Sequence, residues 1–556
     1  MNDIWFYYLL LLVIVGLSAE ELSDNPKIKT SLGGIRGFYD FSSNGRKYEA
    51  YEGIPFAQPP IGDLRFRPPQ KIKPWLGDIV ATKTGSPCMQ FIHHPLDAKE
   101  KIIGSEDCLY LNIYKPVLET TKLLPVIMWI HGGGFQWNMD FKNGKYAGPD
   151  FLMDRDVIFV TFNYRLGPLG FMSTGDDLIS GNMGLKDQSM AISWVKENIK
   201  DFGGNPDLIT LFGLSAGGVS VHYHYLSSLS KGLFRQGLSF SGTALSPWAI
   251  TEAAPEKTKK IATIVGCPSS NNDEMIMCLK SRPARHIAKA AMDFMPWFFN
   301  PMTPFGPVIE KETAESPFIT EAPEKIISTG GVYDAPWITG VVPEEGLYPG
   351  ADFCGDDILL KELDARWDSL VPHILDYNYT IPLDKQIEVN KKIRKYYIGD
   401  SPVDKTTAWS IIHMIGDRFY TAGSVKAVKL MAKSINKPVF YYYFTYKGAE
   451  SLGPIMMRKN MNFGISHGDD AAYVIKFASI NPTTTSNDRM MQRELLDLWV
   501  SYVTNGVPDA GINWKSIDPS EEKLTFLHIR GPGQRQLDSD DNFGNIKFWS
   551  SIEFDE

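Results

Sequence analysis

The sequence predicts an α/β protein with a large, mostly parallel central sheet that is flanked by helices on both faces. The first observation is a set of short apolar runs without polar alternation, which is typical of strands buried on both faces. The second is a helical pattern between two of these runs, because strand, helix and strand in succession indicate parallel neighbours joined by right-handed crossovers. The apolar runs span residues 124–130, 157–164, 208–213, 238–242 and 336–342, and residues 439–446 form a further candidate strand.

The helical pattern lies in residues 184–206, between the second and third apolar runs. Ile192, Val195 and Ile199 fall on one face of this helix. Gly203, followed by a second glycine and a proline two residues later, provides a stop signal. The segment is therefore expected to be a crossover helix that packs one apolar face on the sheet.

The composition is that of an ordinary globular protein, with 43% hydrophobic and 22% charged residues. No Gly/Ser linker, charge block or internal repeat divides the sequence, so we expect residues 20–556 to form one domain. A net charge of −9 without a basic patch argues against nucleic acid as a partner, because phosphate contacts need clustered Lys and Arg. We expect neither a cofactor nor a metal ion.

The N-terminus resembles a secretory signal peptide. Residues 4–15 form an apolar core that is too short to span a bilayer, and Gly16, Ser18 and Ala19 suit cleavage by a peptidase. We therefore expect residues 1–19 to be removed and the protein to be secreted without a stable membrane anchor. An uncleaved anchor is the alternative, because the usual positive residues before the apolar core are missing.

Because the protein is expected to be secreted, disulfides are expected among its five cysteines, since disulfides persist in oxidising compartments. Cys88 and Cys108 bracket one short loop, and Cys267 and Cys278 bracket another. Four cysteines allow three pairings, of which local pairing is the simplest. Cys354 is left over, and we expect a buried thiol there rather than an intermolecular bond.

One sequence for N-linked glycosylation is present, Asn378-Tyr379-Thr380. The similar triplet at Asn481 is excluded by the proline that follows it. Secretion favours modification of Asn378.

Residues 208–220 read "LITLFGLSAGGVS" and contain the pattern G-x-S-x-G around Ser215. Gly213 and Gly217 relax the backbone where a sharp turn would otherwise be strained. This pattern marks a nucleophile elbow when a strand precedes the serine and a helix follows it, and the local pattern predicts both. Ser215 is therefore the candidate nucleophile. A serine hydroxyl needs an adjacent base, and the base needs an orienting acid.

A second glycine-rich stretch, "HGGGF" at 131–135, follows the predicted strand 124–130 directly. Glycines allow bare backbone N–H groups to approach a substrate carbonyl oxygen. We expect the N–H groups of Gly133, Gly134 and Ala216 to form an oxyanion hole, as in hydrolases with an upstream HGGG loop. A flexible glycine turn is the alternative.

The base must come from the few histidines downstream of the serine. His467, in "FGISHGDDAAYV", lies between glycines after the predicted strand 439–446, in a loop that can present an imidazole. A histidine with a purely structural role is the alternative, and position alone does not exclude His373 or His413. The histidines downstream of Ser215 are His222, His224, His286, His373, His413, His467 and His528.

The acid is expected at the end of the predicted strand 336–342, where Glu344 and Glu345 precede Gly346. A carboxylate at a strand tip is well placed to orient an imidazole. Paired glutamates in a loop are more often solvated, which is the alternative for this pair.

Beyond these patterns, the sequence resembles the type-B carboxylesterase/cholinesterase family over nearly the whole mature chain. Together the matching stretches are far more specific than any single motif. They are "YEGIPFAQPPIGDLRFRPP" (51–69), "SEDCLYLNIYKP" (105–116), "HGGGF" (131–135), "NYRLGPLGF" (163–171), "GNMGLKDQ" (181–188), "FGGNP" (202–206), "LFGLSAGG" (211–218) and "SGTALSPWA" (241–249).

The resemblance implies an α/β-hydrolase fold and a Ser-Glu-His triad. It places the nucleophile on Ser215, the acid on Glu345 and the base on His467, and it makes Ser241 a supporting serine. The same resemblance assigns the oxyanion donors to the residues named above. It also matches the local disulfides Cys88–Cys108 and Cys267–Cys278 to the family's first two loops. Because all three triad residues are present, an idle binding or adhesion homologue is the lesser alternative.

The choice of ester is narrowed by what the first disulfide loop contains. Cholinesterases hold the quaternary ammonium with a tryptophan in this loop, but here Phe91 is its one aromatic carbocycle, which makes choline esters improbable. Juvenile hormone esterases resemble this chain at Arg65-Phe66 and Asp187-Gln188. They typically carry glutamine where this chain has Leu214.

Residues 292–310 are rich in Met and Phe, which suits an apolar acyl pocket or, equally, plain core packing. We therefore expect a secreted carboxylesterase whose partner is a small hydrophobic ester substrate. A juvenile hormone esterase is the alternative among hydrolases.

Overall fold

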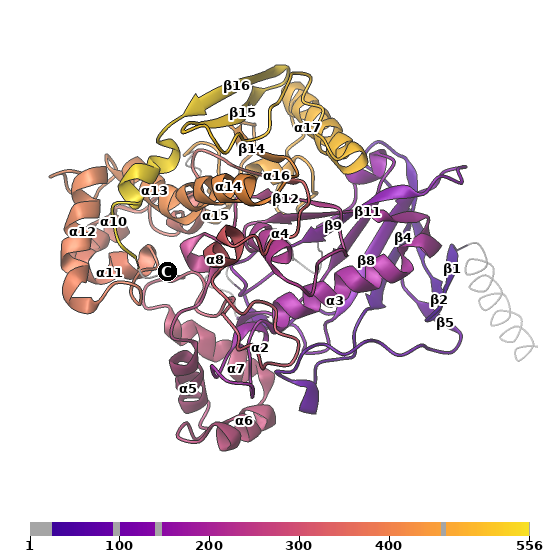
Figure 1. Ribbon diagram of the computed structural model, residues 1–556, viewed down its shortest axis with the longest axis horizontal. Coiled ribbons are helices and arrows are strands. Elements are labelled where there is room, and N and C mark those ends of the chain that lie inside the picture. The colour runs from indigo at the N-terminus through magenta and orange to yellow at the C-terminus, as the bar shows by residue number, and fades with distance from the viewer. Residues whose placement is uncertain (1–24, 93–100, 139–146, 458–462, 555–556) are drawn as a thin grey trace, which may run out of the picture.

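The centre of the molecule is a sheet that has eleven strands within the described residues (Figure 1). The computed structural model describes residues 25–92, 101–138, 147–457 and 463–554. In spatial order the strands are β16 (Gln534–Asp540), β15 (Leu524–Gly531), β14 (Val439–Phe444), β13 (Trp337–Val341), β12 (Gln236–Phe240), β11 (Gly204–Leu214), β9 (Leu124–Ile130), β10 (Ile158–Phe162), β8 (Tyr110–Pro116), β4 (Lys47–Pro55) and β3 (Phe38–Phe41).

The middle of this sheet is parallel and its two edges are antiparallel. Neighbours from β15 across to β10 run parallel, whereas β16 pairs antiparallel with β15, and β8, β4 and β3 pair antiparallel at the other edge. The six apolar runs predicted as strands correspond to β9, β10, β11, β12, β13 and β14. The predicted α/β fold with a mostly parallel sheet is therefore confirmed.

Helices cover both faces of the sheet, as alternate residues of β9 demonstrate. Val126, Met128 and Ile130 belong to one buried cluster, and Ile127 and Trp129 belong to another. The first cluster includes residues of α3 (Met183–Asn198) and α4 (Ala216–Leu226), and the second includes residues of α17 (Ser486–Asn505). Successive side chains of a strand point to opposite faces, so both faces of β9 are buried.

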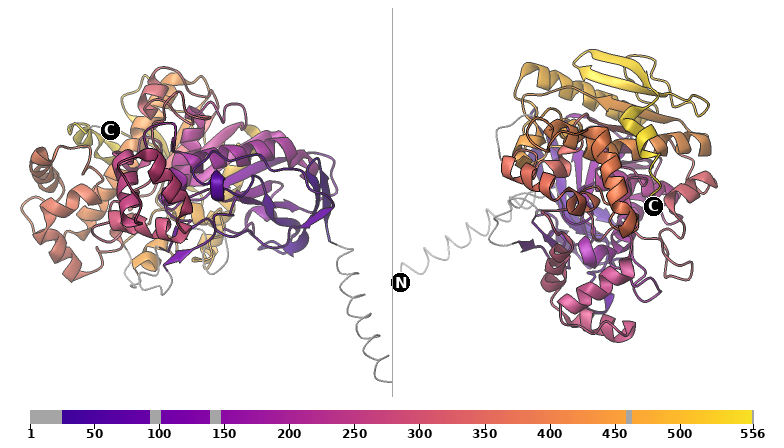
Figure 2. Two further views of the ribbon diagram at one scale, coloured as in Figure 1. Left: turned by 90° about the horizontal axis from the view of Figure 1, so that it is seen from below. Right: turned by 90° about the vertical axis from the view of Figure 1, so that its left-hand side faces the viewer.

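The remaining elements surround this core. Figure 2 shows helices α10–α13 at the end of the molecule opposite the small N-terminal sheet. That sheet is β1 (Lys27–Thr30), β2 (Gly33–Arg36) and β5 (Asp78–Val80), and β6 (Gln90–Phe91) pairs with β7 (Ile102–Ile103). The other helices are α2 (Gly167–Phe171), α5 (Ala254–Ile264), α6 (Asn272–Ser281), α7 (Ala284–Ala290), α8 (Pro323–Ser328), α9 (Leu347–Gly350), α10 (Asp357–Ala365), α11 (Trp367–Ile374), α12 (Leu383–Tyr397), α13 (Ala408–Gly416), α14 (Ala422–Ser434), α15 (Leu452–Met457), α16 (Asp469–Ala472) and α18 (Ile546–Trp549).

The predicted crossover helix is α3. Ile192 and Val195 of α3, and Ile199 just after its end, are fully buried, as expected for the apolar face of the predicted helix. A short 3-10 turn over residues 199–202 follows, and Gly203 ends it with a φ of +81°, in the left-handed region that glycine adopts most easily.

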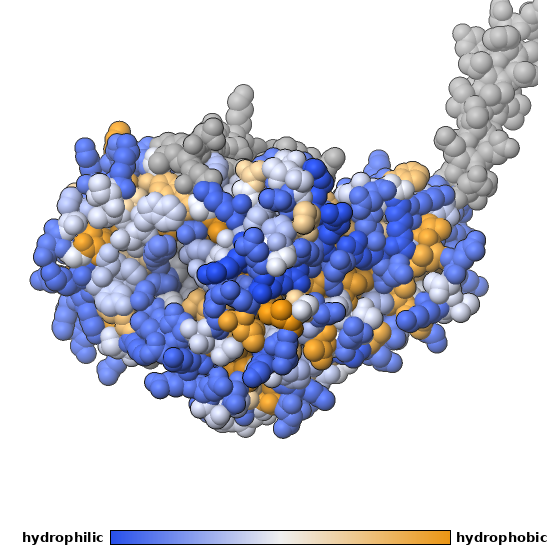
Figure 3. All heavy atoms as spheres, turned by 90° about the horizontal axis from the view of Figure 1, so that it is seen from above, coloured by the Kyte–Doolittle hydropathy of each residue, from blue (hydrophilic) through white to orange (hydrophobic). Residues whose placement is uncertain are grey.

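Two disulfides are present, Cys88–Cys108 and Cys267–Cys278, which is the local pairing. Cys354 is a free thiol, 1% exposed, and burial raises its pKa well above the usual range, so it is a poor nucleophile. No helix of the described residues is long and apolar enough to cross a bilayer. The predicted signal peptide, residues 1–19, lies outside the described residues. On the face shown in Figure 3, hydrophobic residues are dispersed among hydrophilic ones.

Candidate active site

The candidate site lies at the carboxyl ends of the parallel strands, which is where open α/β sheets usually place their ligands. The glycine loop 131–135 follows β9, Ser215 follows β11, and Glu345 follows β13 at a distance of a few residues. The loop that carries His467 meets the end of β13, because Glu344 and Ser466 form a parallel bridge.

Ser215 occupies a strained turn between β11 and α4. Its φ is 60° and its ψ is −123°, and α4 begins at the next residue. Positive φ is costly for a residue with a side chain, and such strain is typical of functional sites. The turn is also tightly packed, because a Cβ on Gly217 would collide with the carbonyl oxygen of Ile130. The predicted strand, turn and helix around Ser215 are therefore all present.

The glycine loop lies beside this turn. Gly133 and Gly134 both have positive φ, +117° and +57°, and a Cβ on Gly133 would collide with the carbonyl oxygen of Trp137. The contact of Gly217 with Ile130 brings the start of α4, including Ala216, next to this loop. The first N–H groups of a helix have no partner within the helix, so they are available to an anion.

The imidazole of His467 is bound by Glu345. Its Nδ1 lies 2.6 Å from Oε2 of Glu345, and both side chains are fully buried. The other carboxylate oxygen of Glu345 accepts the N–H of Val342 at 2.9 Å and the hydroxyl of Ser241 at 2.5 Å. An acid held in this way keeps the proton on Nδ1 and leaves Nε2 free to act as a base.

Two buried atoms of the site have no hydrogen-bond partner in the described part of the chain, Oγ of Ser215 and Nε2 of His467. Such atoms are uncommon in folded proteins and call for an explanation. Gly468, which follows His467, lies close to Leu214, which precedes Ser215. A Cβ on Gly468 would lie 3.0 Å from the side chain of Leu214. In hydrolases without substrate, catalytic hydrogen bonds are often long and tighten on binding.

Two tyrosines pack against the imidazole of His467. The ring of Tyr348 is stacked on it with centroids 5.6 Å apart, and that of Tyr420 is tilted at 4.5 Å. Tyr420 belongs to a π-helical turn, Asp417–Thr421, between α13 and α14. Such turns are frequent at functional sites. Burial raises the pKa of both tyrosines well above the usual range, so both rings are neutral.

The alternative bases lie elsewhere or have other partners. His413 faces Glu344, at 3.9 Å between Nε2 and Oε1, and is half-exposed on α13. His373 is partly buried, which lowers its pKa. Burial lowers the pKa of His222 and of His224 to about 3, which makes both neutral structural residues.

An aromatic cluster lies near the glycine loop. Phe91 stacks on Phe299 with ring centroids 5.9 Å apart, and Trp137 packs on both. Trp137 in turn contacts Tyr348, the residue stacked on His467. A Cβ on Gly134 would lie 3.3 Å from the side chain of Met302. The Met- and Phe-rich segment 292–310 thus packs in the core and also lies against the glycine loop.

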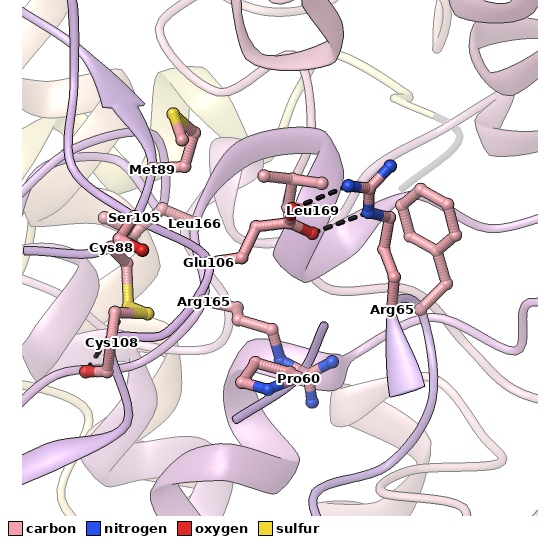
Figure 4. Close-up of a pocket in the computed structure, with 11 residues that line it drawn as sticks. Pro60, Arg65, Cys88, Met89, Ser105, Glu106, Cys108, Arg165, Leu166 and Leu169 are labelled. Carbon is pink, nitrogen blue, oxygen red and sulfur yellow. Dashed lines mark hydrogen bonds and ion pairs between the residues drawn. A yellow bond between two sulfur atoms is a disulfide. The ribbon is translucent and has the colours of Figure 1, made fainter. Parts of the chain in front are cut away.

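A small pocket has Arg65 among its lining residues (Figure 4). It lies beside the Cys88–Cys108 disulfide, and none of the predicted triad residues lines it. Arg65 forms a two-point ion pair with Glu106 at 2.5 and 2.6 Å and also donates to the carbonyl oxygens of three residues that follow Cys278. Arg65 therefore links the two disulfide loops. No group of three or more potential metal ligands occurs among the described residues.

Sequence reasoning missed two contributors to this site, Tyr348 and Tyr420, and it gave Glu344 no role separate from that of Glu345. Tyr348 lies three residues after Glu345, and this proximity was a usable signal. Nothing in "GDRFYT" marks Tyr420, because a π-helical turn has no sequence signature that separates it from an α-helix.

Comparison with known proteins shows the family to which the chain belongs. Residues 24–549 match the model of the carboxylesterase family. A carboxylic ester hydrolase of Bombus ignitus is 48% identical, and venom carboxylesterase-6 of Apis mellifera is 47% identical, each over 99% of this chain and 98% of the relative. The crystal structure of juvenile hormone esterase from Manduca sexta, with OTFP covalently attached, has a TM-score of 0.83 at 27% identity and covers 95% of this chain and 99% of its own.

The protein is thus an α/β-hydrolase, as its fold and its structural neighbour agree. The chain belongs to the carboxylesterase family, and it is a carboxylic ester hydrolase.

Proposed function

We propose that the protein is a secreted serine carboxylesterase that hydrolyses hydrophobic carboxylic esters with Ser215 as nucleophile, His467 as base and Glu345 as acid. The observation that carries the proposal is the buried hydrogen bond of 2.6 Å between Glu345 and His467, beside a serine in a strained elbow. A buried acid bound to Nδ1 is the arrangement that makes the opposite nitrogen of an imidazole basic.

In this mechanism, Oγ of Ser215 attacks the ester carbonyl carbon while Nε2 of His467 accepts the hydroxyl proton. The carbonyl oxygen becomes an anion that accepts hydrogen bonds from the N–H groups of Gly133, Gly134 and Ala216. The C–O bond to the alcohol then breaks, and His467 returns the proton to the departing oxygen. Water attacks the acyl-enzyme with the same base, which releases the acid and restores Ser215.

The oxyanion donors supply a large share of the rate. Each such donor is worth about 2.7–4 kcal/mol in a serine hydrolase, because it is aimed at charge that exists only in the transition state. The glycine loop supports this role, because Gly133 and Gly134 have positive φ and the loop lies next to the start of α4, which carries Ala216.

The aromatic cluster of Phe91, Trp137, Phe299 and Tyr348 supports a hydrophobic substrate, since these buried rings adjoin both the glycine loop and His467. The structural neighbour from Manduca sexta is a juvenile hormone esterase, and juvenile hormone is therefore the second candidate substrate. Comparing kcat/KM for juvenile hormone with that for simple aliphatic esters separates the two. A ratio above about a hundredfold in favour of the hormone establishes the narrower function.

Secretion belongs to the same proposal, with residues 1–19 as signal peptide and 20–556 as one mature domain. Glycosylation at Asn378 is part of it. Asn378 lies in the turn between α11 and α12 and is half-buried, and Thr380 of the sequon is buried. Expression in insect cells tests both points through the N-terminal sequence of the secreted protein and its mass before and after glycosidase treatment.

Turnover of p-nitrophenyl butyrate tests the catalytic assignment. We expect Ser215→Ala to lower kcat by about 10⁴-fold or more, because it removes the nucleophile. The exposed Ser228 supplies a control, and Ser228→Ala leaves turnover unchanged. Full activity in Ser215→Ala, or in His467→Ala, contradicts the proposal.

A further inference from the structure

Glu344 precedes the proposed acid in sequence but faces a different partner. Its Oε2 accepts the backbone N–H of Ile465 at 2.7 Å, and its own N–H donates to the carbonyl oxygen of Ile465 at 3.2 Å. The residue is 8% exposed, so it is not the solvated carboxylate that paired glutamates in a loop suggest. Ile465 lies two residues before His467, and Glu344 therefore binds the loop that carries the proposed base.

Gly464 fits this contact. Its φ is +104°, and a Cβ there would collide with the carboxylate oxygens of Glu344. A side chain at 464 would therefore displace the carboxylate from the backbone of the loop. Glycine at position 464 is thus required for steric reasons, independently of any role in the reaction.

The loop has a second tether of the same kind. Oδ2 of Asp469 accepts the N–H of Ser466 at 2.7 Å, and its Oδ1 accepts the N–H of Leu452 at 2.8 Å. Two carboxylates thus hold two successive N–H groups just before His467. Removal of Glu344 is expected to loosen the loop without unfolding it, because Asp469 remains.

The other side of Glu344 faces His413 of α13. Oε1 of Glu344 lies 3.9 Å from Nε2 of His413, too far for a hydrogen bond but close enough to raise the pKa of that imidazole. The side chain of His413 is 48% exposed. The hydrogen bond to Ile465 is therefore the stronger of the two interactions of this carboxylate.

We propose that Glu344 is a positioning residue for the base. By holding the N–H of Ile465, it fixes the His467 loop to the same segment that carries Glu345, so that acid and base keep one relative geometry. The inference rests on the proposed triad. A shift of about 1 Å in a reacting group lowers a rate by about a hundredfold, which is the size of effect that such an anchor can control.

The test compares three substitutions of Glu344. We expect Glu344→Ala to lower kcat by about 10–100-fold with KM within twofold of wild type, because the base moves while the substrate contacts stay. Glu344→Gln keeps an acceptor oxygen for Ile465 and retains kcat within about threefold. Glu344→Asp keeps the charge but is one methylene too short to reach Ile465, and it behaves like the alanine variant.

All rates are expressed per active site, counted by titration with a fluorophosphonate, so that misfolded protein does not lower kcat. Glu324, an exposed glutamate of α8 paired with Lys426, provides the matched control, and Glu324→Ala leaves kcat unchanged. If Glu344→Ala does not fold, the contrast between the Asp and Gln variants decides the question.

The inference is overturned if Glu344→Ala lowers the melting temperature but keeps kcat per titrated site. It is also overturned if Glu344→Asp is active and Glu344→Gln is not, because charge rather than the hydrogen bond would then matter. Wild-type activity in His467→Ala would contradict the proposed triad itself, and it is therefore distinguishable from a failure of the Glu344 inference alone.

Discussion

Two loops deliver the two reacting atoms of the proposed mechanism, and they are held in place by different means. The elbow around Ser215 is fixed by close backbone contacts, in which the glycines at 213 and 217 leave no room for a side chain. The loop before His467 is fixed by carboxylate side chains, Glu344 and Asp469, that accept its N–H groups.

The difference shows what kind of change each loop tolerates. A contact between backbones fails as soon as a methyl group is added, because main-chain atoms have nowhere to move. A tether through a side chain fails by degrees, since another residue with an acceptor can replace it. The elbow should therefore be all-or-none in its response to mutation, and the His467 loop should be graded.

The largest effect is expected at the elbow. Gly217→Ala places a methyl group against the carbonyl oxygens of Ile130 and His131, which displaces either the turn or the glycine loop. We expect ester hydrolysis to fall to background and the free energy of unfolding to fall by about 3 kcal/mol or more. Turnover and urea unfolding measure the two. Gly203→Ala is the control, because its Cβ would enter open space and only the positive φ of +81° opposes it, at a cost of about 1 kcal/mol.

The next effect concerns the acid. Glu345→Gln keeps the shape of the side chain but directs an amide either at Nδ1 of His467 or at its other partners, Val342 and Ser241. The imidazole then loses the tautomer that leaves Nε2 free. We expect kcat to fall by about 10³–10⁴-fold, as in other triads, with little change in KM. A fall of less than tenfold in steady-state kinetics would exclude Glu345 as the acid.

A smaller effect is expected from the supporting serine. Ser241→Ala removes the hydroxyl that donates to Glu345 at 2.5 Å, and the hydrogen bonds to Val342 and His467 remain. A hydrogen bond to a charged group is worth about 1.5–3 kcal/mol, which converts to a loss of about 10–100-fold in kcat if it acts on the transition state. An unchanged kcat together with a lower melting temperature would show that Ser241 serves folding alone.

The smallest effect is a dependence of stability on pH. Burial raises the pKa of Asp470 to about 6, and its carboxylate accepts the hydroxyl of Tyr442. Between pH 4 and 6 the folded state then holds a proton that the unfolded chain releases, so the free energy of unfolding falls as pH rises, by about 2 kcal/mol. Asp470→Asn is expected to reduce this slope, because it cannot ionise and the Tyr442 hydroxyl can turn to meet the amide. The neighbouring Asp469, whose pKa burial raises to about 7, keeps a slope of the same sign. Urea unfolding at pH 4, 6 and 7.5 gives the free energy of unfolding of the wild type and of Asp470→Asn. If the two free energies change with pH in parallel, the raised pKa of Asp470 is contradicted.

The comparison of the two loops also explains how far the sequence alone could lead. The elbow and the glycine loop were predicted because their requirement is local, glycines within a few residues of the reacting atoms. The central strands were predicted for the same reason, since burial on both faces makes each one a continuous apolar run. The antiparallel edge strands were not predicted. β16, for example, is largely exposed and reads "QRQLDSD", which carries no apolar signal.

The identification of the base and the acid depended on information that no local sequence pattern contains. Glu344 and Glu345 are adjacent in sequence, and only the folded chain shows that one faces Ile465 and the other faces His467. Local sequence could not rank His467 above His413 either, because both lie far from the two glutamates in the chain. Only the fold brings Glu345 to His467 and Glu344 to within 3.9 Å of His413. The resemblance to the carboxylesterase family indicated the assignment, and the contact of Glu345 with His467 supports it.

The most direct test of the triad is covalent labelling by a fluorophosphonate, followed by peptide mass spectrometry. We predict a single adduct on the peptide that contains Ser215, formed at least about a thousandfold more slowly in His467→Ala, because the serine then lacks its base. An adduct on a different serine, or equal labelling rates in both proteins, would contradict the account.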